Sequence, residues 1–506
     1  MEGKASNTDL TTPAQPISQL PQQSISSTPT LAEVLKAECT EKGTATEGPL
    51  TNPACQADDD SEIVKWDGES DPELPLNWPS SKKWQNVVMV SALTFVTPFA
   101  SSMFAPAINQ VMAEMGTTNR DIGSFGVSIY LLGYAFGPLV LGPCSELYGR
   151  LIVYHICALL FILCNVACAA PLTIGPGTVA DCFRQEERGR AMAVWTMPVL
   201  LGPCLGPAIG AYVSRSLGWR WNFWLLIIVG GFKSSAVSLF CLVFQQETHP
   251  LTLLKRKAAR LRKSTGNPNI RHVDHATISR SQIITTSIVR PIKMLFLSPV
   301  VFGLSLLTAV AYGTLYLFFT TVTDVFASRY GIVTNVGLIY LGCGCGQFAG
   351  LLILGLVSDA IVKRAAKGGE MKPEYRLPPT ILGGSMIPIG LLIYGWTAEY
   401  SVFWFVPVIG TFFIGFGMIT VFTPVGTYLI DAFPMYAASA TAANTVLRSV
   451  GGAFLPLAGP RMYSSLGQGW GNTLLAGISL LMMGMIFMSL KYGERLRTHP
   501  KYQMKL

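Results

Sequence analysis

The stretch VFWFVPVIGTFFIGFGMITVFTPVG, residues 402–426, contains no charged side chain. A helix that crosses the hydrocarbon core of a bilayer needs about 20 consecutive apolar residues. The stretch therefore predicts a transmembrane helix, because a backbone exposed to lipid must satisfy its hydrogen bonds internally. Ten further runs predict helices of the same kind: 84–106, 122–144, 151–170, 191–213, 221–244, 296–321, 333–357, 378–396, 439–459 and 470–490.

The composition agrees with this pattern. Half of the 506 residues are hydrophobic and only 13% are charged, and the mean hydropathy is +0.42. These values exclude a water-soluble globular domain. We therefore expect an all-α polytopic membrane protein with eleven clear spans.

Polar segments divide the chain. Residues 1–83 are rich in Ser, Thr, Pro and Gln and predict a disordered tail. Basic residues are concentrated in the central segment 245–295 and in the tail 491–506. Since basic loops stay in the cytoplasm, all three polar segments are expected there. They separate an N-terminal helix bundle, 84–244, from a C-terminal helix bundle, 296–490.

The two bundles differ in their number of runs. Six runs in the second bundle return the chain to its starting side, whereas the first bundle has only five. With five crossings, the sequences YGR at 148–150 and RQEERGR at 184–190 would lie on opposite sides of the membrane. Either the N-terminal tail is outside the cell or one crossing has been lost.

An internal repeat favours the loss of a crossing. GPCSE at 142–146 resembles GLVSD at 355–359, and DCF at 181–183 resembles DAF at 431–433. In the second half, about 72 residues separate the two acids, and in the first half about 35. About 18 of the residues in the second half form a polar loop. Without this loop, the first half is still shorter by about one 20-residue helix.

Three stretches carry a resemblance to a known family: WDGESDPELPLNWPSSKKW at 66–84, ETHPLTLLKRKAARLRK at 247–263 and NTVLRSVGGAFLPLAG at 444–459. They resemble the fungal drug:proton antiporters of the major facilitator superfamily, which have twelve helices. The resemblance extends from Trp66 to Lys491. It implies the major facilitator fold, in which two pseudo-symmetric helix bundles move about a shared cavity.

The resemblance also explains the missing crossing. The fourth helix of this family begins with an Arg that is linked to proton coupling, but this sequence has no Arg or Lys between Arg150 and Arg184. PLTIGPGTVADCF, residues 171–183, resembles only the last part of that helix. We therefore expect the fourth family helix to be truncated, through a misplaced intron boundary or a splice variant. A natural eleven-helix form is the rival explanation.

The resemblance implies conformational roles for two motifs. One is the loop between helices two and three, where Leu147 and Leu151 replace basic residues that are usual in the family. The other is the glycine-rich MPVLLGPCLGPAIGA at 197–211, whose glycines would allow a partner helix to approach closely. Simple turn anchoring and ordinary small-residue packing are the alternatives. The expected gating residues are Gly142, Glu146, Gly149, Arg150, Gly202, Gly206, Pro207, Gly210, Asp359 and Asp431.

Three ionisable residues lie within predicted spans, where charge is costly and suggests function. Lys233 could attract an anionic or phenolate-bearing substrate, unless it marks a displaced helix end. Arg448 is predicted to pair with Asp431 or Asp359, and His155 could titrate or pack at the interface. Cavities of such transporters lie at the midplane between the halves. Candidate cavity residues are Tyr130, Tyr134, Trp195, Tyr312, Tyr316 and Asn444.

The expected function is export of a small amphipathic organic compound in exchange for protons. The sequence contains no G-x-x-x-x-G-K-[ST] motif, which argues against a P-loop ATPase. The resemblance points to a drug or a self-made polyketide toxin, such as a cercosporin-like compound, as the cargo. The fungal plasma membrane is the expected location and the vacuolar membrane is the alternative. We expect a monomer in contact with substrate, protons and lipid, with no nucleic acid, cofactor or metal.

Other functions compete with this one. A facilitator or importer without proton coupling is favoured by the missing Arg, and a truncated variant could be unable to transport. A membrane enzyme would need a cluster of metal-ligating residues. For that, the basic linker offers only His272 and His275, which are weak evidence.

Overall fold

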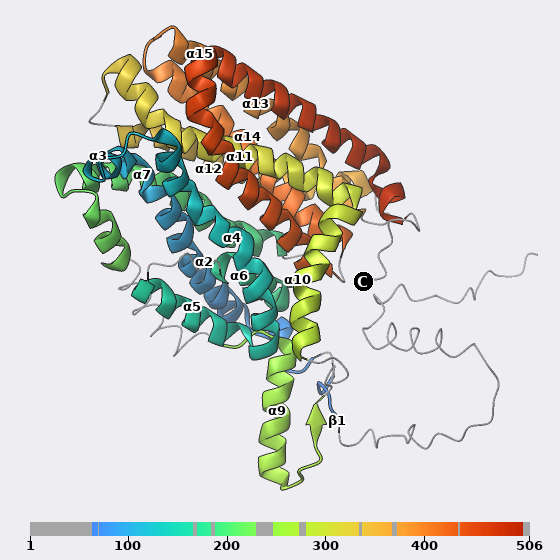
Figure 1. Cartoon of the computed structure of the whole chain (residues 1–506). Helices are drawn as coiled ribbons and strands as arrows, with labels where there is room; N and C mark the ends of the chain where they lie inside the picture. Colours follow the sequence, from blue (N-terminus) through green and yellow to red (C-terminus); the bar gives the residue numbers. More distant parts are fainter. Residues whose placement is uncertain are drawn as a thin grey trace, which may run out of the picture. The chain divides into compact units, whose positions relative to one another are not determined.

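The computed structural model describes residues 63–68, 70–164, 170–183, 188–228, 246–272, 280–332, 336–366, 372–433 and 436–498. The described chain is almost entirely helical (Figure 1). The elements are β1 (Ile63–Val64), η2 (Pro75–Asn77), α2 (Ser80–Met103), η3 (Ala105–Ala107), α3 (Ile108–Glu114), α4 (Arg120–Tyr148), α5 (Arg150–Cys164), α6 (Ala170–Cys182), α7 (Arg188–Ser216), α9 (Pro250–Thr265), β2 (Arg271–His272), α10 (Arg280–Leu297), α11 (Pro299–Tyr330), α12 (Val336–Ala366), η4 (Pro373–Arg376), α13 (Pro378–Glu399), α14 (Phe405–Ala432) and α15 (Ala437–Thr498).

Membrane-crossing helices dominate this architecture. Within the described ranges, eight helical stretches are long and apolar enough to cross a bilayer. The last of them, Ser439–Arg497, has 59 residues, about three times the roughly 20 residues that one crossing requires. It is interrupted at Gly467, whose φ of 76° is incompatible with a helix. The two predicted runs 439–459 and 470–490 lie on either side of this break. The predicted run 221–244 is described only as far as residue 228, where it is helical.

The helices form two packed groups that contact each other. In the first half, α2 packs against α7, and in the second half α13 packs against α14 and both α11 and α13 pack against α15. Contacts between the halves run mainly through α4 with α15 and through α7 with α12. The all-α, two-bundle fold expected from the sequence is confirmed.

A short helical hairpin resolves the counting problem of the first half. The Arg150 guanidinium, at the start of α5, donates to the Asp181 carboxylate, at the end of α6, over 2.6 Å. Both ends of the hairpin, at Arg150 and Asp181, therefore lie on the same side of the molecule.

The predicted run 151–170 is described in part. Helix α5 is described from Arg150 to Cys164 and α6 from Ala170 to Cys182. The truncation of the fourth family helix stays a prediction. Residues 165–169, which join the two helices, lie outside the described part of the chain.

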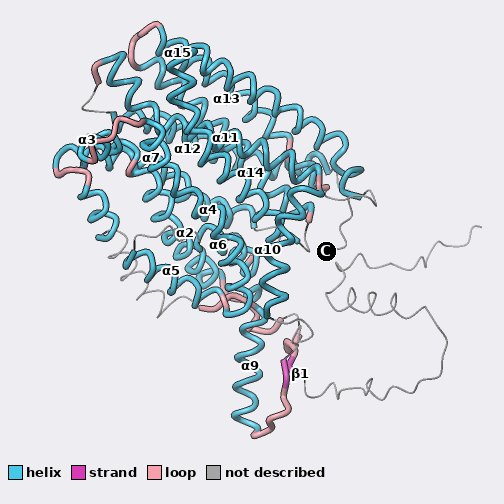
Figure 2. Tube along the Cα trace, in the orientation of Figure 1, coloured by secondary structure: helices cyan, strands magenta, loops and turns pink. Residues whose placement is uncertain are grey.

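An ordered segment precedes the first long helix, in contrast to the disordered tail expected up to residue 83. Strand β1 pairs in parallel with β2 of the central segment, and Figure 2 shows β1 beside α9. Lys257 of α9 donates to Asp67 and Asp71, and Asp71 is buried. Opposite charges and a buried apolar contact between Val64 and Leu254 hold this segment against α9. The composition of the segment does not reveal these contacts. Residues 1–62 lie outside the described ranges.

Candidate functional site

A cavity of about 480 Å³ lies between the two halves. Its volume falls in the range of clefts that bind small organic molecules, about 300–1,000 Å³. The first half contributes Pro138, Gly142, Ser145, Arg150, Ile174, Pro176, Gly177, Ala180, Asp181, Met192, Trp195, Thr196 and Val199, and the second half contributes Phe422, Thr423, Gly426, Thr427, Ile430, Ala437, Thr441, Ala442, Asn444, Thr445 and Arg448. Apolar and small polar side chains therefore make up most of its wall.

The cavity reaches one end of the helices. Its lining includes Arg150 in the first turn of α5, Asp181 in the last turn of α6 and Ala437 at the start of α15. We call this end of the molecule the basic end, because Glu247, which binds the start of α5, directly precedes the helix α9, which is rich in Lys and Arg. The other end of the helices is called the far end.

The halves are in contact toward the far end. Next to the cavity, the Ser101 and Tyr316 hydroxyls of α2 and α11 lie 2.9 Å apart. Farther along, the Asn109 amide donates to Asp324 over 2.8 Å, and Arg461 of α15 pairs with Asp121 of α4. The structure therefore shows a cavity that reaches the basic end while the halves are joined at the far end.

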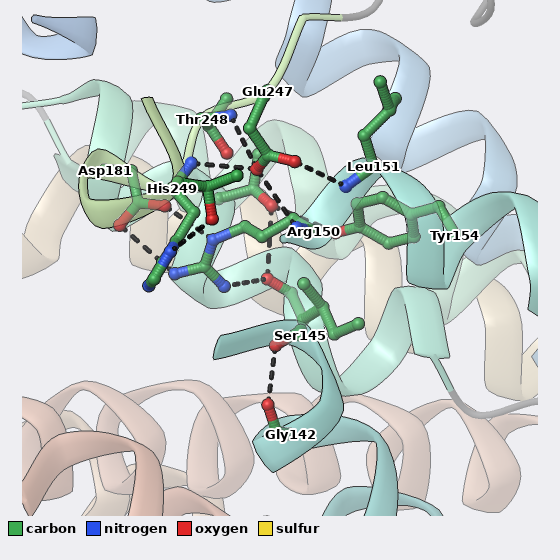
Figure 3. Close-up of polar contacts among 12 residues, drawn as sticks. Gly142, Ser145, Arg150, Leu151, Tyr154, Asp181, Glu247, Thr248 and His249 are labelled. Atoms are coloured by element: carbon green, nitrogen blue, oxygen red, sulfur yellow. Dashed lines mark hydrogen bonds and ion pairs between the residues drawn. The ribbon is translucent and has the colours of Figure 1, made fainter. Parts of the chain in front are cut away.

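A buried carboxylate fixes the turn between α4 and α5 (Figure 3). Glu247 accepts hydrogen bonds from the backbone N–H groups of Arg150 and Leu151, and from those of Thr248 and His249. Negative charge at the N-terminus of α5 is favourable because the first N–H groups of a helix have no partner within it. Gly149 precedes α5 with φ of +93°, and a Cβ there would press on the Glu247 carboxylate. This position therefore requires glycine.

Two ion pairs occupy corresponding places in the two halves. Arg150 binds Asp181 through Nε and Nη2, and Arg376 binds Asp431 through Nε at 2.7 Å. In the first half, the Arg at the start of α5 binds the acid near the end of α6. In the second half, the Arg just before α13 binds the acid near the end of α14. The acids of the DCF and DAF markers thus have equivalent partners.

The prediction that Arg448 pairs with Asp431 is wrong. Asp431 is engaged by Arg376, while the Arg448 guanidinium lies 4.8 Å from the ring centre of Tyr312 and 4.5 Å from that of Phe422. The Asp359 side chain lies outside the description, so the alternative pairing is not tested. Arg448 is buried among aromatic rings at the cavity wall, where the acid at the end of α14 does not reach it.

The glycine-rich motif forms the contact between α7 and α2. A Cβ on Gly202 would lie 2.8 Å from the Phe99 backbone nitrogen, and a Cβ on Gly206 would lie 2.7 Å from the Phe99 carbonyl oxygen. Gly210 faces the Met103 carbonyl at still shorter range. Pro207 is buried within α7 next to this contact. The close helix approach expected from the sequence is present.

Two of the six predicted cavity residues are among the described residues that line the cavity. Trp195 and Asn444 line the cavity, the first donating to Thr94 and the second accepting from Thr308. The four tyrosines are not among the described lining residues. Tyr134 and Tyr316 are buried and hydrogen-bonded to α2, at the Thr97 carbonyl and the Ser101 hydroxyl. Tyr130 packs edge-on against Tyr134, and Tyr312 lies against Tyr316. They form a layer next to the cavity.

Other predicted residues are less informative. Lys233 lies outside the described residues, and so does the side chain of Glu146. Gly142 lines the cavity with open space around its Cα. His155 is half-buried in α5 and is not among the described lining residues, and its Nε2 has no hydrogen-bond partner within the described chain.

Sequence reasoning missed several residues of the basic end. Asp181 was recognised only as a repeat marker, and Glu247, His249 and Arg376 were not singled out. The repeat did contain a usable signal, since equivalent acids at 181 and 431 require equivalent basic partners. Nothing in the local sequence of ETHP indicates that its Glu caps a helix almost one hundred residues earlier.

His249 makes the junction with the central segment sensitive to acid. Burial and the nearby positive charge of Arg150 lower the pKa of His249 to about 4, against the opposing effect of Glu247. The folded protein therefore keeps His249 neutral, whereas the unfolded chain takes up a proton near pH 6.5. Since the unfolded state then binds more protons, stability falls by up to about 3 kcal/mol as the pH decreases from 6.5 to 4.

We expect His249→Asn to remove this part of the acid sensitivity. The measurement is the melting temperature of the purified protein at pH 7.5 and at pH 5, for wild type and variant. The wild type should lose more degrees than the variant between the two pH values. An equal loss in both proteins would show that His249 titrates without consequence for folding.

Comparisons with known proteins agree on one family. The sequence pattern that describes the Major Facilitator Superfamily matches residues 90–456. The chain is 48% identical to the MFS-type transporter penM of Penicillium rubens, with 88% of this chain and 91% of that protein covered. It is 44% identical to the efflux pump radE of Floropilus chiversii, with 97% and 95% covered. The xylose transporter XylE of E. coli has a similar fold, with a TM-score of 0.60 at 14% identity over 82% of this chain and 98% of XylE.

The lengths of these alignments exceed the number of residues that this chain contributes to them. The alignment with radE covers 516 positions, but 97% of this 506-residue chain is only about 491 residues. About 25 aligned positions therefore have no residue in this chain. One membrane crossing requires about 20 residues. For penM, 467 positions compare with about 445 residues, again a deficit of about one crossing. In both alignments the positions without a residue in this chain add up to about one helix-length.

Proposed function

Because the chain belongs to the Major Facilitator Superfamily, whose members are membrane transporters and not enzymes, we propose that it exports small amphipathic organic compounds in exchange for protons. The single observation that carries this proposal is the cavity between the halves, which reaches the basic end while the halves are joined at the far end. Transporters built from two repeats bind substrate at such an interface and expose it to one side at a time.

The direction of transport follows from charge and from the relatives. The basic residues of α9 favour a cytoplasmic position for the basic end, so the cavity is ready to load from the cytoplasm. The name of radE describes an efflux pump. We propose the same direction here, with secondary metabolites or drugs as cargo and the plasma membrane as the location. The vacuolar membrane is the alternative location, and a monomer is the proposed working unit.

Proton coupling requires an acid that substrate and protons can both reach. Asp181 is the acid among the described cavity-lining residues, and Arg150 holds it. Protonation of Asp181 would weaken this pair and so link a proton to the packing at the basic end. We propose Asp181 as the proton site. Its position at the cavity mouth supports the proposal.

Export can be tested in a yeast strain that lacks its own drug exporters. We expect the full chain to lower the intracellular level of fluorescent amphipathic dyes and to raise resistance to toxic polyketides, relative to an empty vector. A version with an additional helix-length of chain inserted between residues 164 and 170, copied from penM, is the matched comparison. Activity in neither version would contradict the export proposal, and activity only in the longer version would identify this chain as a transport-defective variant.

Coupling is tested with the purified protein in vesicles. An antiporter should accumulate substrate when the lumen is acidic, because protons leave as substrate enters. Accumulation only with acid outside would indicate an importer of the symport type. Uptake that equilibrates without regard to the pH gradient would favour a facilitator.

A further inference from the structure

Arg448 occupies an unusual position for a charged residue. It lies in α15 within a predicted membrane crossing, is only 7% exposed and lines the cavity. The rings of Tyr312 and Phe422 lie within cation–π distance of its guanidinium. These rings position the side chain, but they do not neutralise its charge.

No carboxylate pairs with Arg448 within the described residues. Asp431, one of the two partners that the sequence suggested, is engaged by Arg376, and Asp181, the acid among the described lining residues, is engaged by Arg150. The Nε of Arg448 is buried, and no hydrogen-bond acceptor contacts it in the described chain. A buried nitrogen of a cation without an acceptor is costly, so the position favours an anion from outside the chain.

The charges on the cavity wall lead to the same conclusion. The charged side chains among the described lining residues are Arg150, Asp181 and Arg448. Arg150 and Asp181 neutralise each other at the mouth, which leaves one positive charge at Arg448. The remaining wall is mainly apolar or carries small hydroxyl and amide groups. Such a cavity is complementary to an apolar molecule with a single negative charge.

We propose that Arg448 binds the acidic group of the transported compound, which is therefore an organic monoanion. A carboxylate is the best match, because the guanidinium presents parallel N–H donors to its two oxygens. An ionised phenol or enol on an apolar body has the same chemistry with one oxygen. Asn444, one helical turn earlier on the same face of α15, lines the same cavity and adds a polar neighbour. This inference rests on the proposed function for the identity of the cavity as a substrate site.

Binding to the purified full chain tests the inference separately from transport. The probes are 2-naphthoate, an anion, and methyl 2-naphthoate, a neutral ester with the same ring system, measured by calorimetry at pH 7. We expect wild type to bind the anion at least tenfold more tightly than the ester. In Arg448→Gln this preference should disappear, with weaker binding of the anion and ester affinity within twofold of wild type. Arg448→Lys should retain part of it.

The chain supplies a matched control in Arg290. Its guanidinium also lies near an aromatic ring, that of Tyr436, and its Nε is also buried without a partner in the described chain, but Arg290 is not among the described cavity-lining residues. Arg290→Gln should leave the preference unchanged. Equal binding of both probes by wild type, or equal weakening of both by Arg448→Gln, would overturn the inference.

The comparison of the two probes on wild type requires no variant. It can therefore overturn the inference even where Arg448→Gln does not fold. Failure of the export proposal has a different signature. A protein that prefers the anion through Arg448 but moves no substrate in vesicles retains this inference and loses the proposed function. A protein that exports neutral compounds and shows no anion preference retains the proposed function and loses this inference.

Discussion

Replacing Gly210 by alanine is expected to abolish transport almost completely. The added Cβ would overlap the Met103 carbonyl at the C-terminal end of α2, so the backbone of α2 or α7 would have to shift. Overpacking of a close-packed contact costs about 1–3 kcal/mol, and more where backbone must shift. Because 1.4 kcal/mol corresponds to a factor of ten, we expect transport to fall by at least about tenfold. Gly206→Ala should act similarly through the Phe99 carbonyl.

The matched controls are Gly477→Ala and Gly484→Ala in α15, where an added Cβ meets nothing within 4 Å. These variants should transport as wild type does. The measurement is initial transport rate per folded protein, with folded protein counted by size-exclusion chromatography. A folded Gly210→Ala protein with wild-type transport would show that α2 and α7 do not need their close approach, in either function or folding.

Periodicity and composition were sufficient to predict the architecture. Runs such as 402–426 specify their own helix, because the bilayer leaves the backbone no other way to satisfy its hydrogen bonds. The glycine spacing at 202, 206 and 210 likewise specified a close helix contact, since a face without side chains is a local property. Both are features that a single helix carries in its own sequence.

Partner choice among charged side chains was not predictable in the same way. Asp431 has two arginines within plausible reach of α14, and only the three-dimensional course of η4 and α13 brings Arg376 to it. Arg448 was assigned a carboxylate because isolated charges in membranes are usually paired, but its neighbours are rings.

The second large effect is expected from the Arg150–Asp181 pair. Its side chains are each 14% exposed, and loss of one partner from a buried pair costs about 3–5 kcal/mol. Some water reaches this pair, so we expect the lower figure, about 3 kcal/mol, for Asp181→Asn or Arg150→Met. The pair joins the start of α5 to the end of α6, beside the Glu247 cap. Each single variant should therefore be less stable and transport at least about tenfold more slowly.

A double replacement separates stability from function. Apolar residues of similar size often substitute for a buried ion pair at little cost, so Arg150→Met combined with Asp181→Leu should melt near the wild-type temperature. Its transport should remain low, because the cavity mouth then lacks the acid proposed to carry the proton.

The corresponding pair of the second half is the control for this experiment. Neither Arg376 nor Asp431 is among the described residues that line the cavity. The double variant Arg376→Met with Asp431→Leu should therefore recover stability and transport together. If the Arg150–Asp181 double variant also recovers both, the two pairs are equivalent braces that hold helix ends together, and the proton site must be sought at another residue.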